Sequence, residues 1–272
     1  MSATSKKSKG GLLTAKTLRI PDVDASTRDV LFTIFHRYYD MVSRAQFEKD
    51  FSEKNAVILL CTKDGVPHGF STLKDLDTVV DGRRVRGVFS GDTVIEKEFW
   101  GQGSLGVEFL KYLFSQKTKA PFTPFYWFLI SKGYKTYLLM ANNFDHHWPR
   151  HDDVTPAFER RVLDTWGSAM FGDAYRGDDG LIVWPESLGQ LKEGVADIDR
   201  ELIGTNPRVA FFQQKNPTWQ HGTELCCLAK MTWAMPFTYW WKVMTTKRTP
   251  KVPRALESVT SGGVKSSGRV AS

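Results

Sequence analysis

Cysteine is scarce in this sequence, and its pattern excludes two kinds of small stabilised domain. The chain has 272 residues and three cysteines, of which Cys226 and Cys227 are adjacent. Three cysteines without a Cys-x-x-Cys spacing supply neither a disulfide framework nor a common zinc motif. This usage is typical of a reducing compartment, so we expect a cytoplasmic protein.

Long hydrophobic runs are missing as well. The two most apolar stretches, 122–130 and 233–244, are too short to span a bilayer, and proline or polar residues interrupt both. We therefore expect no integral membrane helix. Residues 1–16 also lack the continuous apolar segment and the cleavage site of a secretory signal, and we interpret them as a flexible tail.

Acidic residues are scarce near both ends of the chain. Residues 1–16 hold four lysines and no acid, and residues 245–272 hold six basic residues and one acid. Because the whole chain has a net charge of only +7, the part between the tails is slightly acidic. A nucleic-acid-binding domain concentrates basic charge on its folded surface, so we expect no nucleic-acid partner. Basic tails suit an anionic membrane surface or simple solubility.

The residues that are plentiful indicate a sizeable folded core. Hydrophobic residues make up 41% of the chain and aromatic residues 13%, which suffices for one large domain. We expect disordered basic tails at 1–17 and 245–272 around a single α+β domain at 18–244.

Hydrophobic periodicity predicts the elements of the first half. Apolar spacing favours a helix over 27–41, and Ser43 is a suitable N-cap for a second helix over 43–53. We predict strands at 18–20, 56–61, 67–73 and 85–95, with turns at 63–65 and at Asp81-Gly82.

The second half is predicted in the same way. An apolar segment at 126–132 ends at Gly133, and a buried strand follows at 134–141. Thr155 and Pro156 are typical of the start of a helix, which we expect to reach about residue 171. We also predict a helix at 190–204 and strands at 208–213 and 224–231.

A glycine-rich loop carries the strongest functional signal. It lies between the predicted strand 85–95 and an amphipathic helix, and it consists of Trp100, Gly101, Gln102, Gly103, Ser104, Leu105 and Gly106. Such a turn directs several backbone N–H groups to one point, and the helix dipole adds positive charge there, which suits a phosphate or pyrophosphate. The spacing also matches a dinucleotide fingerprint, although that motif belongs to an early βαβ unit. A turn that only lets strand and helix pack is the third interpretation.

The order of these elements resembles the GNAT acyltransferase superfamily over residues 18–145. In that family the loop reads Arg or Gln, two residues, Gly, any residue, then Gly or Ala, and its amides hold the pyrophosphate of acyl-CoA. Gly101, Gln102 and Gly103 fit this pattern, whereas Trp100 and Leu105 depart from it. The resemblance implies a mixed, mostly antiparallel sheet flanked by helices, and residues 146–244 would form an elaborated C-terminal part.

The resemblance also implies how the donor is held. It assigns residues Trp100 to Gly106 to the donor, which is either acyl-CoA or an acyl-carrier-protein thioester. The segment 134–141, followed by Asn142, resembles the family's fifth strand, beside which the thioester lies, so Asn142 is a further candidate donor contact.

A base near the end of the fourth strand is usual in such families. N-acyl transfer requires a neutral amine, a polarised thioester carbonyl and a proton for the leaving thiolate. Glu96 is our first candidate for the base and Asp92 the second, since regular alternation would place both on one face of the strand. The alternative is that both are solvated charges at a strand end.

Three histidines cluster in the segment 145–153. His146 and His147 are candidates for acid or base duty, because imidazole titrates near neutral pH. His147 and His151 have a spacing that would allow a shared metal on a helix, but Pro149 lies between them and no HExxH motif is present, so we expect no metal. A hydrogen-bonded loop is the simpler interpretation.

Two segments rich in aromatic residues, 122–130 and 231–241, complete the pattern. Basic residues follow the second one, as in segments that bind a membrane interface. Both segments are also compatible with an ordinary core.

The sequence therefore predicts an N-acyltransferase that moves an acyl group, preferably a fatty acyl group, from a thioester donor to a primary amine of a lipid or amphipathic acceptor. We expect it in the cytoplasm, with an anionic membrane surface on the inner face as a candidate partner. One alternative is an acetyltransferase for a small soluble amine, and another is an inactive relative of the same fold that only binds a lipid or a partner.

Overall fold

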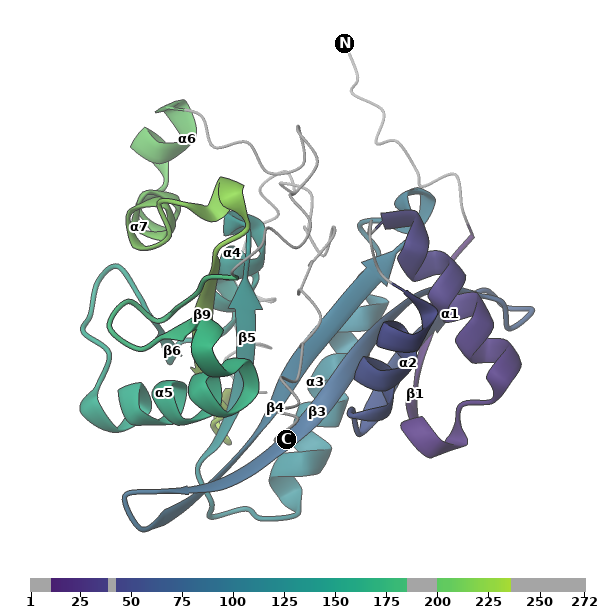
Figure 1. The fold of residues 1–272 in the computed structure, drawn as a ribbon, viewed down its shortest axis with the longest axis horizontal. Helices are drawn as coiled ribbons and strands as arrows, with labels where there is room; N and C mark the ends of the chain where they lie inside the picture. The colour runs from purple at the N-terminus through teal and green to yellow at the C-terminus, as the bar shows by residue number, and fades with distance from the viewer. Residues whose placement is uncertain (1–10, 39–42, 185–199, 236–272) are drawn as a thin grey trace, which may run out of the picture.

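The computed structural model describes residues 11–38, 43–184 and 200–235, which form a mixed sheet flanked by helices (Figure 1). The nine strands described follow the order β1, β2, β3, β4, β5, β9, β8, β7, and β6 pairs with β9. Neighbouring strands are antiparallel, apart from β4 and β5, which are parallel. The strands are β1 (Thr14–Arg19), β2 (Ala56–Cys61), β3 (Pro67–Val80), β4 (Arg83–Ile95), β5 (Phe125–Ser131), β6 (His147–Trp148), β7 (Tyr175–Arg176), β8 (Leu181–Ile182) and β9 (Glu224–Lys230).

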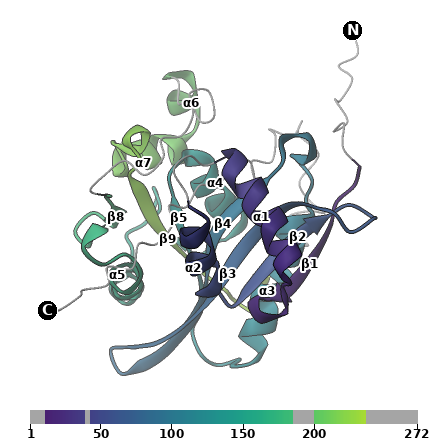
Figure 2. The same ribbon diagram turned by 45° about the vertical axis from the view of Figure 1, so that its right-hand side comes forward.

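Helices lie on both faces of this sheet (Figures 1 and 2). They are α1 (Ala25–Tyr38), α2 (Arg44–Ser52), α3 (Ser104–Thr118), α4 (Tyr134–Asn143), α5 (Ala157–Phe171), α6 (Arg200–Thr205) and α7 (Pro207–Lys215). The predicted N-cap of α2 is confirmed, because the Ser43 hydroxyl accepts a hydrogen bond from the Gln46 amide at 3.1 Å. The predicted fold class, a mostly antiparallel sheet flanked by helices with an extended C-terminal half, is confirmed.

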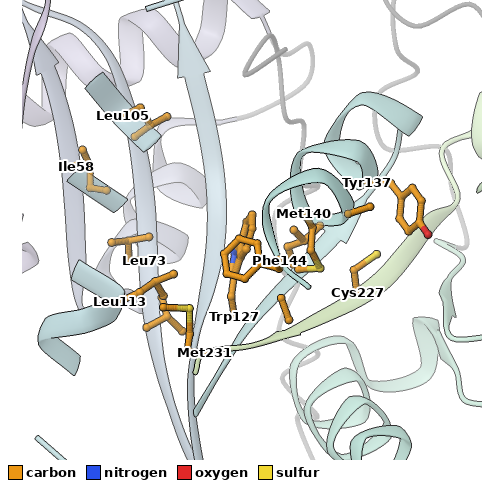
Figure 3. Packing of buried hydrophobic residues seen from close by; sticks show 14 of the residues in the cluster. Ile58, Leu73, Leu105, Leu113, Trp127, Tyr137, Met140, Phe144, Cys227 and Met231 are labelled. Carbon is orange, nitrogen blue, oxygen red and sulfur yellow. The ribbon is translucent and has the colours of Figure 1, made fainter. Parts of the chain in front are cut away.

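The core is divided by the sheet. On one face, α1 and α2 pack against alternate residues of β2 and β3, such as Leu59 and Phe70. On the other face, α3 and α4 pack around Trp127 of β5, whose ring centroid lies 5.0 Å from that of Phe144 (Figure 3). Helix α5 covers the first face again at β5, where it contacts Phe128. Both halves of the chain therefore share one continuous sheet.

Strand β4 contains a bulge that reverses its alternation. Ser90 pairs with Leu73 and Thr93 pairs with Ser71, so Gly91 and Asp92 together oppose one residue of β3. Before the bulge Phe89 faces α5, and after it Val94 faces α1 and α2 on the same side of the sheet. The bulge thus changes which residues at the end of β4 reach the α1 face.

Strands β4 and β5 separate after Phe89, just before the bulge. Their parallel pairing runs from Arg86 with Phe125 to Phe89 with Phe128, while β4 continues to Ile95. The two strands diverge towards their C-terminal ends in Figure 1. The backbone edges of β4 and β5 that face each other there are not joined by ladder hydrogen bonds within the described chain.

Two predicted strands are helices. Residues 134–141 belong to α4, and the strand beside β4 is instead β5, so Gly133 is the N-cap of a helix and does not end one. Tyr137, Met140 and Ala141 are buried with helical spacing, which a uniformly apolar segment conceals. Residues 208–213 belong to α7, which begins at Pro207 after the Asn206 N-cap.

Smaller differences concern element ends. Strand β1 begins at Thr14, ahead of the predicted start at residue 18, and β3 extends to Val80. Helix α5 has Pro156 as its N-cap, so the predicted cap at Thr155 is not formed. Most of the predicted helix at 190–204 and the segment 236–244 lie outside the described residues, as do residues 245–272.

Candidate active site at the end of β4

The glycine loop lies between the end of β4 and α3, as predicted. A short 3-10 turn at Lys97–Phe99 joins β4 to the loop. Gly101 is exposed and has a φ of +80°, a left-handed conformation that glycine adopts without strain, and a Cβ atom there would meet nothing within 4 Å. Gly103 is also exposed and is the N-cap of α3. The loop therefore presents backbone, and not side chains, to the solvent.

The first residues of α3 supply partly positive backbone groups. The amides of Ser104, Leu105 and Gly106 lie in the first turn, where a helix offers them no internal acceptor. The Leu105 side chain is 3% exposed and packs into the core, so it anchors this turn to the sheet. This side chain is thus directed inwards, away from the exposed side of the loop.

Two side chains tether the loop to its surroundings. The Trp100 indole Nε1 donates a hydrogen bond to the Ile95 carbonyl at 2.7 Å, which folds the loop back on the end of β4. The Gln102 amide accepts from the Leu13 backbone N–H at 2.7 Å and donates to the Gly11 carbonyl at 3.0 Å. Both residues therefore position the loop.

Glu96 is the centre of a polar cluster beside this loop. It follows β4 directly, and its side chain is 10% exposed. Its Oε1 atom bonds with the Arg37 guanidinium at the end of α1, and its Oε2 atom lies 2.6 Å from Nδ1 of His68 on β3. The structure thus brings together a carboxylate, an imidazole and a guanidinium from three elements.

A tyrosine closes the cluster on the α1 side. The Tyr38 hydroxyl accepts a hydrogen bond from the Lys97 backbone N–H at 3.1 Å. Burial raises the pKa of Tyr38, with smaller contributions from nearby carboxylates. This hydroxyl therefore stays protonated at neutral pH, and it fixes the end of α1 against the turn that leads to the glycine loop.

Asp92 is buried within the β4 bulge and is 9% exposed. Beyond the bulge the pairing of β4 with β3 is regular again from Thr93 to Ile95. Among the described residues, the ion pairs of Glu96 are with Arg37 and His68.

His146 and His147 lie elsewhere. Strand β6 pairs with β9, so β5 and β9 stand between these histidines and β4. His146 is exposed, whereas His147 is 2% exposed and its Nδ1 atom donates to the Phe144 carbonyl at 2.8 Å. Its Nε2 atom is buried without a hydrogen-bond partner in the described part of the chain. Desolvation lowers the pKa of His147, which keeps the imidazole neutral.

Asn142 lies in a helix and not after a strand. It lies in the last turn of α4, where its side-chain oxygen accepts a hydrogen bond from Arg208 of α7. Because α4 replaces the predicted strand, Asn142 does not stand at the end of a strand beside β4.

The sequence reasoning missed Arg37 and His68. The β3–β4 hairpin turn at Asp81-Gly82 alone would pair His68 with Ile95, and the bulge in β4 moves His68 opposite Glu96. In the described ranges, no group of three or more His, Cys, Asp or Glu side chains is arranged to hold a metal ion. No described helix combines the length and apolar character needed to cross a membrane.

Comparisons with known proteins give structural similarities only. No family model matches the sequence, and no curated protein matches it. A probable N-acyltransferase from Enterococcus faecalis V583 is 14% identical, with a TM-score of 0.38 over 47% of this chain and 32% of the other. The present chain therefore spans about a third of that protein.

Two further similar structures are themselves described as acetyltransferases. The GNAT-family N-acetyltransferase YhbS from Escherichia coli, solved in complex with CoA, is 13% identical with a TM-score of 0.36, over 50% of this chain and 72% of the other. A protein from Corynebacterium glutamicum, described as histone acetyltransferase HPA2 and related acetyltransferase, is 13% identical with a TM-score of 0.33, over 53% and 92%. Each of these similarities covers about half of the present chain at low sequence identity.

Proposed function

We propose that this protein is an N-acyltransferase that moves an acyl group from a CoA thioester to a primary amine. The observation that carries the proposal is the exposed backbone of Gly101–Gly103 at the N-terminus of α3, beside the diverging ends of β4 and β5.

The loop suits the phosphates of the donor. Helix α3 is 15 residues long, so its N-terminal dipole and first-turn amides act on one exposed point. The tethers at Trp100 and Gln102 hold this point in place before any ligand arrives. A preorganised set of amides costs little ordering on binding, which favours an anionic pyrophosphate over a neutral ligand.

The diverging strands suit the thioester arm. The arm of CoA is an extended chain with two amide groups, and such a chain can pair with an unpaired strand edge. Strands β4 and β5 present such edges beyond Phe89 and Phe128. Backbone N–H groups there would also stabilise the negative charge that develops on the thioester oxygen.

The polar cluster at Glu96 suits the amine. An ammonium group must lose a proton before it attacks the thioester. Glu96 and His68 lie on the α1 side of the sheet, at the end of the strand that leads into the donor loop. Asp92, in the bulge of the same strand, remains the second candidate from the sequence.

The aromatic residues of the sequence indicate which acyl group and which amine are the substrates. We propose a fatty acyl donor and an amphipathic or lipid amine, supported by exposed aromatic side chains at one end of the sheet. Phe122 is 99% exposed and Trp233 is 47% exposed, and the Trp233 indole donates to the Pro121 carbonyl at 3.2 Å. Transfer of an acetyl group to a small soluble amine is the competing form of the same reaction.

Donor binding gives the first experiment. Gly103→Glu places a negative charge at the N-cap of α3, where the φ of −81° is accessible to any residue. Calorimetry with CoA should show affinity reduced at least tenfold, because the new carboxylate repels the phosphates. Val79→Glu is the matched control, since Val79 is 64% exposed and lies near the other end of the β3–β4 hairpin, roughly 40 Å away at about 3.3 Å per residue.

Turnover gives the second experiment. Wild-type protein is incubated with acetyl-CoA or palmitoyl-CoA and with ethanolamine or a long-chain amine, and free thiol is measured. Release of CoA that depends on both partners supports the reaction, and the preferred pair decides between the two forms. Equal CoA affinity in wild type and Gly103→Glu, or no amine-dependent release with any pair, would refute the proposal.

A further inference from the structure

We infer that His68 is the group that accepts the proton of the amine, and that Glu96 positions it. This assignment rests on the proposed acyl transfer and deepens it, because it moves the acceptance of the proton from Glu96 to His68. The juxtaposition of Arg37, His68 and Glu96 carries it.

Both oxygens of Glu96 are already engaged. Oε1 bonds with the Arg37 guanidinium and Oε2 with the imidazole of His68. The Glu96 side chain is 10% exposed, against 24% for His68 and 58% for Arg37. A substrate that approaches from the solvent therefore reaches the imidazole more readily than the carboxylate.

The contact with Glu96 also fixes the tautomer of His68. An ionised carboxylate only accepts hydrogen bonds, so Nδ1 must carry the proton at 2.6 Å from Oε2. The lone pair of the neutral ring then lies on Nε2. The described residues provide no hydrogen-bond partner for that atom, which leaves Nε2 available to a ligand.

The ring is held in one orientation. His68 packs on Phe99, with ring centroids 4.5 Å apart, and Phe99 belongs to the turn before the glycine loop. The Glu96 backbone N–H donates to the His68 carbonyl at 2.9 Å, which joins the two backbones as well as the side chains. The imidazole is thus fixed against the turn that leads into the glycine loop.

The charged groups around the imidazole come from several elements. Glu96 follows β4, Arg37 ends α1, and Asp64 lies in the turn before β3 and interacts with His68. The pKa of Asp64 is lowered mainly by a hydrogen bond with the Thr62 side chain. Electrostatic attraction by His68 lowers it by a smaller amount. Tyr38 and Lys97 complete the surroundings through their mutual hydrogen bond. Two carboxylates and one guanidinium thus flank a ring that must cycle between neutral and cationic forms.

The proton balance of the step is simple. The ammonium proton of the acceptor passes to Nε2, and the freed nitrogen lone pair attacks the thioester carbonyl carbon. A C–N bond forms, the C–S bond breaks, and its electron pair leaves with sulfur. The thiolate takes up one proton that the amine nitrogen loses as the amide forms, and His68 returns its proton to water. Glu96 keeps Nδ1 protonated and stabilises the imidazolium, so it is a positioning residue.

The experiment compares three variants with wild type under saturating donor. His68→Gln should lower kcat/KM at least a hundredfold, the usual scale for a lost base, and should remove the fall in rate on the acid side of the pH profile. His68→Ala should regain part of the rate when free imidazole is added, which a purely structural role does not predict. His36→Gln is the matched control, because His36 is an exposed histidine on α1.

A spectroscopic measurement tests the positioning role without turnover. Nitrogen NMR of wild type should show the His68 tautomer with its proton on Nδ1, and Glu96→Gln should mix the two tautomers. Circular dichroism and unfolding midpoints establish that each variant is folded.

The outcomes separate the two proposals. An active wild type whose rate is unchanged in folded His68→Gln overturns the assignment of His68 and leaves acyl transfer intact. A wild type that transfers no acyl group to any amine overturns the proposed function and this assignment with it. A hundredfold loss with rescue by imidazole supports both.

Discussion

The Trp100 indole donates a hydrogen bond to the carbonyl of Ile95 at 2.7 Å, and this contact joins the glycine loop to the last residue of β4. Trp100 directly precedes Gly101, the first glycine of the loop. The indole ring packs on the main core cluster, so the residue supports the loop from the core side. The Trp100 side chain therefore serves as a structural tether.

The first prediction concerns that tether. Trp100→Phe keeps an aromatic ring but removes the hydrogen bond, which contributes about 1 kcal/mol. A less ordered loop should weaken CoA binding about fivefold in calorimetry, with a small change in stability. Trp233→Phe removes an equivalent indole bond, to the Pro121 carbonyl at 3.2 Å, away from the loop. If both variants lose the same affinity, the Trp100 contact has no special part in donor binding.

The second prediction concerns the bulge that reverses β4. A Cβ atom on Gly91 would lie 2.5 Å from Oγ1 of Thr72 and 3.1 Å from Cε of Lys54. Gly91→Ala should therefore lower the free energy of unfolding by about 1–3 kcal/mol, as expected for overpacking, and should shift the end of β4. Chemical denaturation measures the loss, and amine-dependent turnover should fall with it.

Gly106→Ala provides the comparison for this variant. Gly106 lies in the first turn of α3, and a Cβ atom there meets nothing within 4 Å. Alanine in a helix is favoured over glycine by about 0.5–1 kcal/mol, so this variant should be as stable as wild type or more so. A Gly91→Ala protein that matches it in stability would show that the bulge tolerates a side chain.

The sequence predicted the first half of the fold better than the second, for physical reasons. Residues 56–61 and the turn at Asp81-Gly82 carry clear strand and hairpin signals, and the donor loop followed from its glycines. The segment 134–141 was predicted as a strand but forms a helix, because a buried helix in a uniformly apolar stretch shows no polar face. Asn142 therefore lies at the end of a helix, and not after the strand that the sequence predicted.

The partners of Glu96 were missed for a different reason. Counting back from the hairpin turn pairs His68 with Ile95, and only the extra residue of the bulge brings His68 opposite Glu96. A bulge leaves no reliable signal in a single sequence beyond a glycine such as Gly91. Arg37 comes from α1, and no local pattern relates it to β4. Long-range pairings of this kind depend on tertiary packing.

The third prediction uses the pKa of His147. Desolvation lowers this pKa from its ordinary value near 6.5, so the unfolded chain binds a proton more readily than the folded chain does. Above that value the ring is neutral in both states and its contribution to stability is fully present. As the pH falls below it, the unfolded state gains protons first, and stability falls by at most about 1.4 kcal/mol per pH unit.

Urea unfolding at pH 7.5 and pH 5.5 measures this effect. His147→Asn cannot titrate, so its stability should fall less between the two values than that of wild type. His146→Asn is the control, because His146 is exposed and its neighbour remains intact. Identical pH dependence in wild type and His147→Asn would mean that the buried imidazole is not the group that senses acid.

The last prediction concerns the exposed aromatic residues Phe122 and Trp233. They adjoin each other through the bond from Trp233 to Pro121, and the Lys117 ammonium lies 5.1 Å from the centre of the Trp233 ring. Aromatic rings beside cations are typical of a membrane interface. Residues 236–241 of the aromatic segment 231–241, and the basic tail after them, lie outside the described residues, so the side chains of Phe122 and Trp233 provide the direct test.

We expect wild-type protein to sediment with anionic liposomes, and we expect salt to weaken this binding only in part. Each basic residue near such a surface contributes about 1 kcal/mol, and salt screens that contribution, whereas insertion of aromatic rings persists. The double variant Phe122→Ser and Trp233→Ser should therefore bind about tenfold more weakly in high salt, a change of about 1.4 kcal/mol. Val154→Ser is the matched control, because Val154 is 82% exposed at another site. If wild type does not sediment with anionic liposomes even at low salt, the membrane is not a partner, and a small soluble amine becomes the better candidate acceptor.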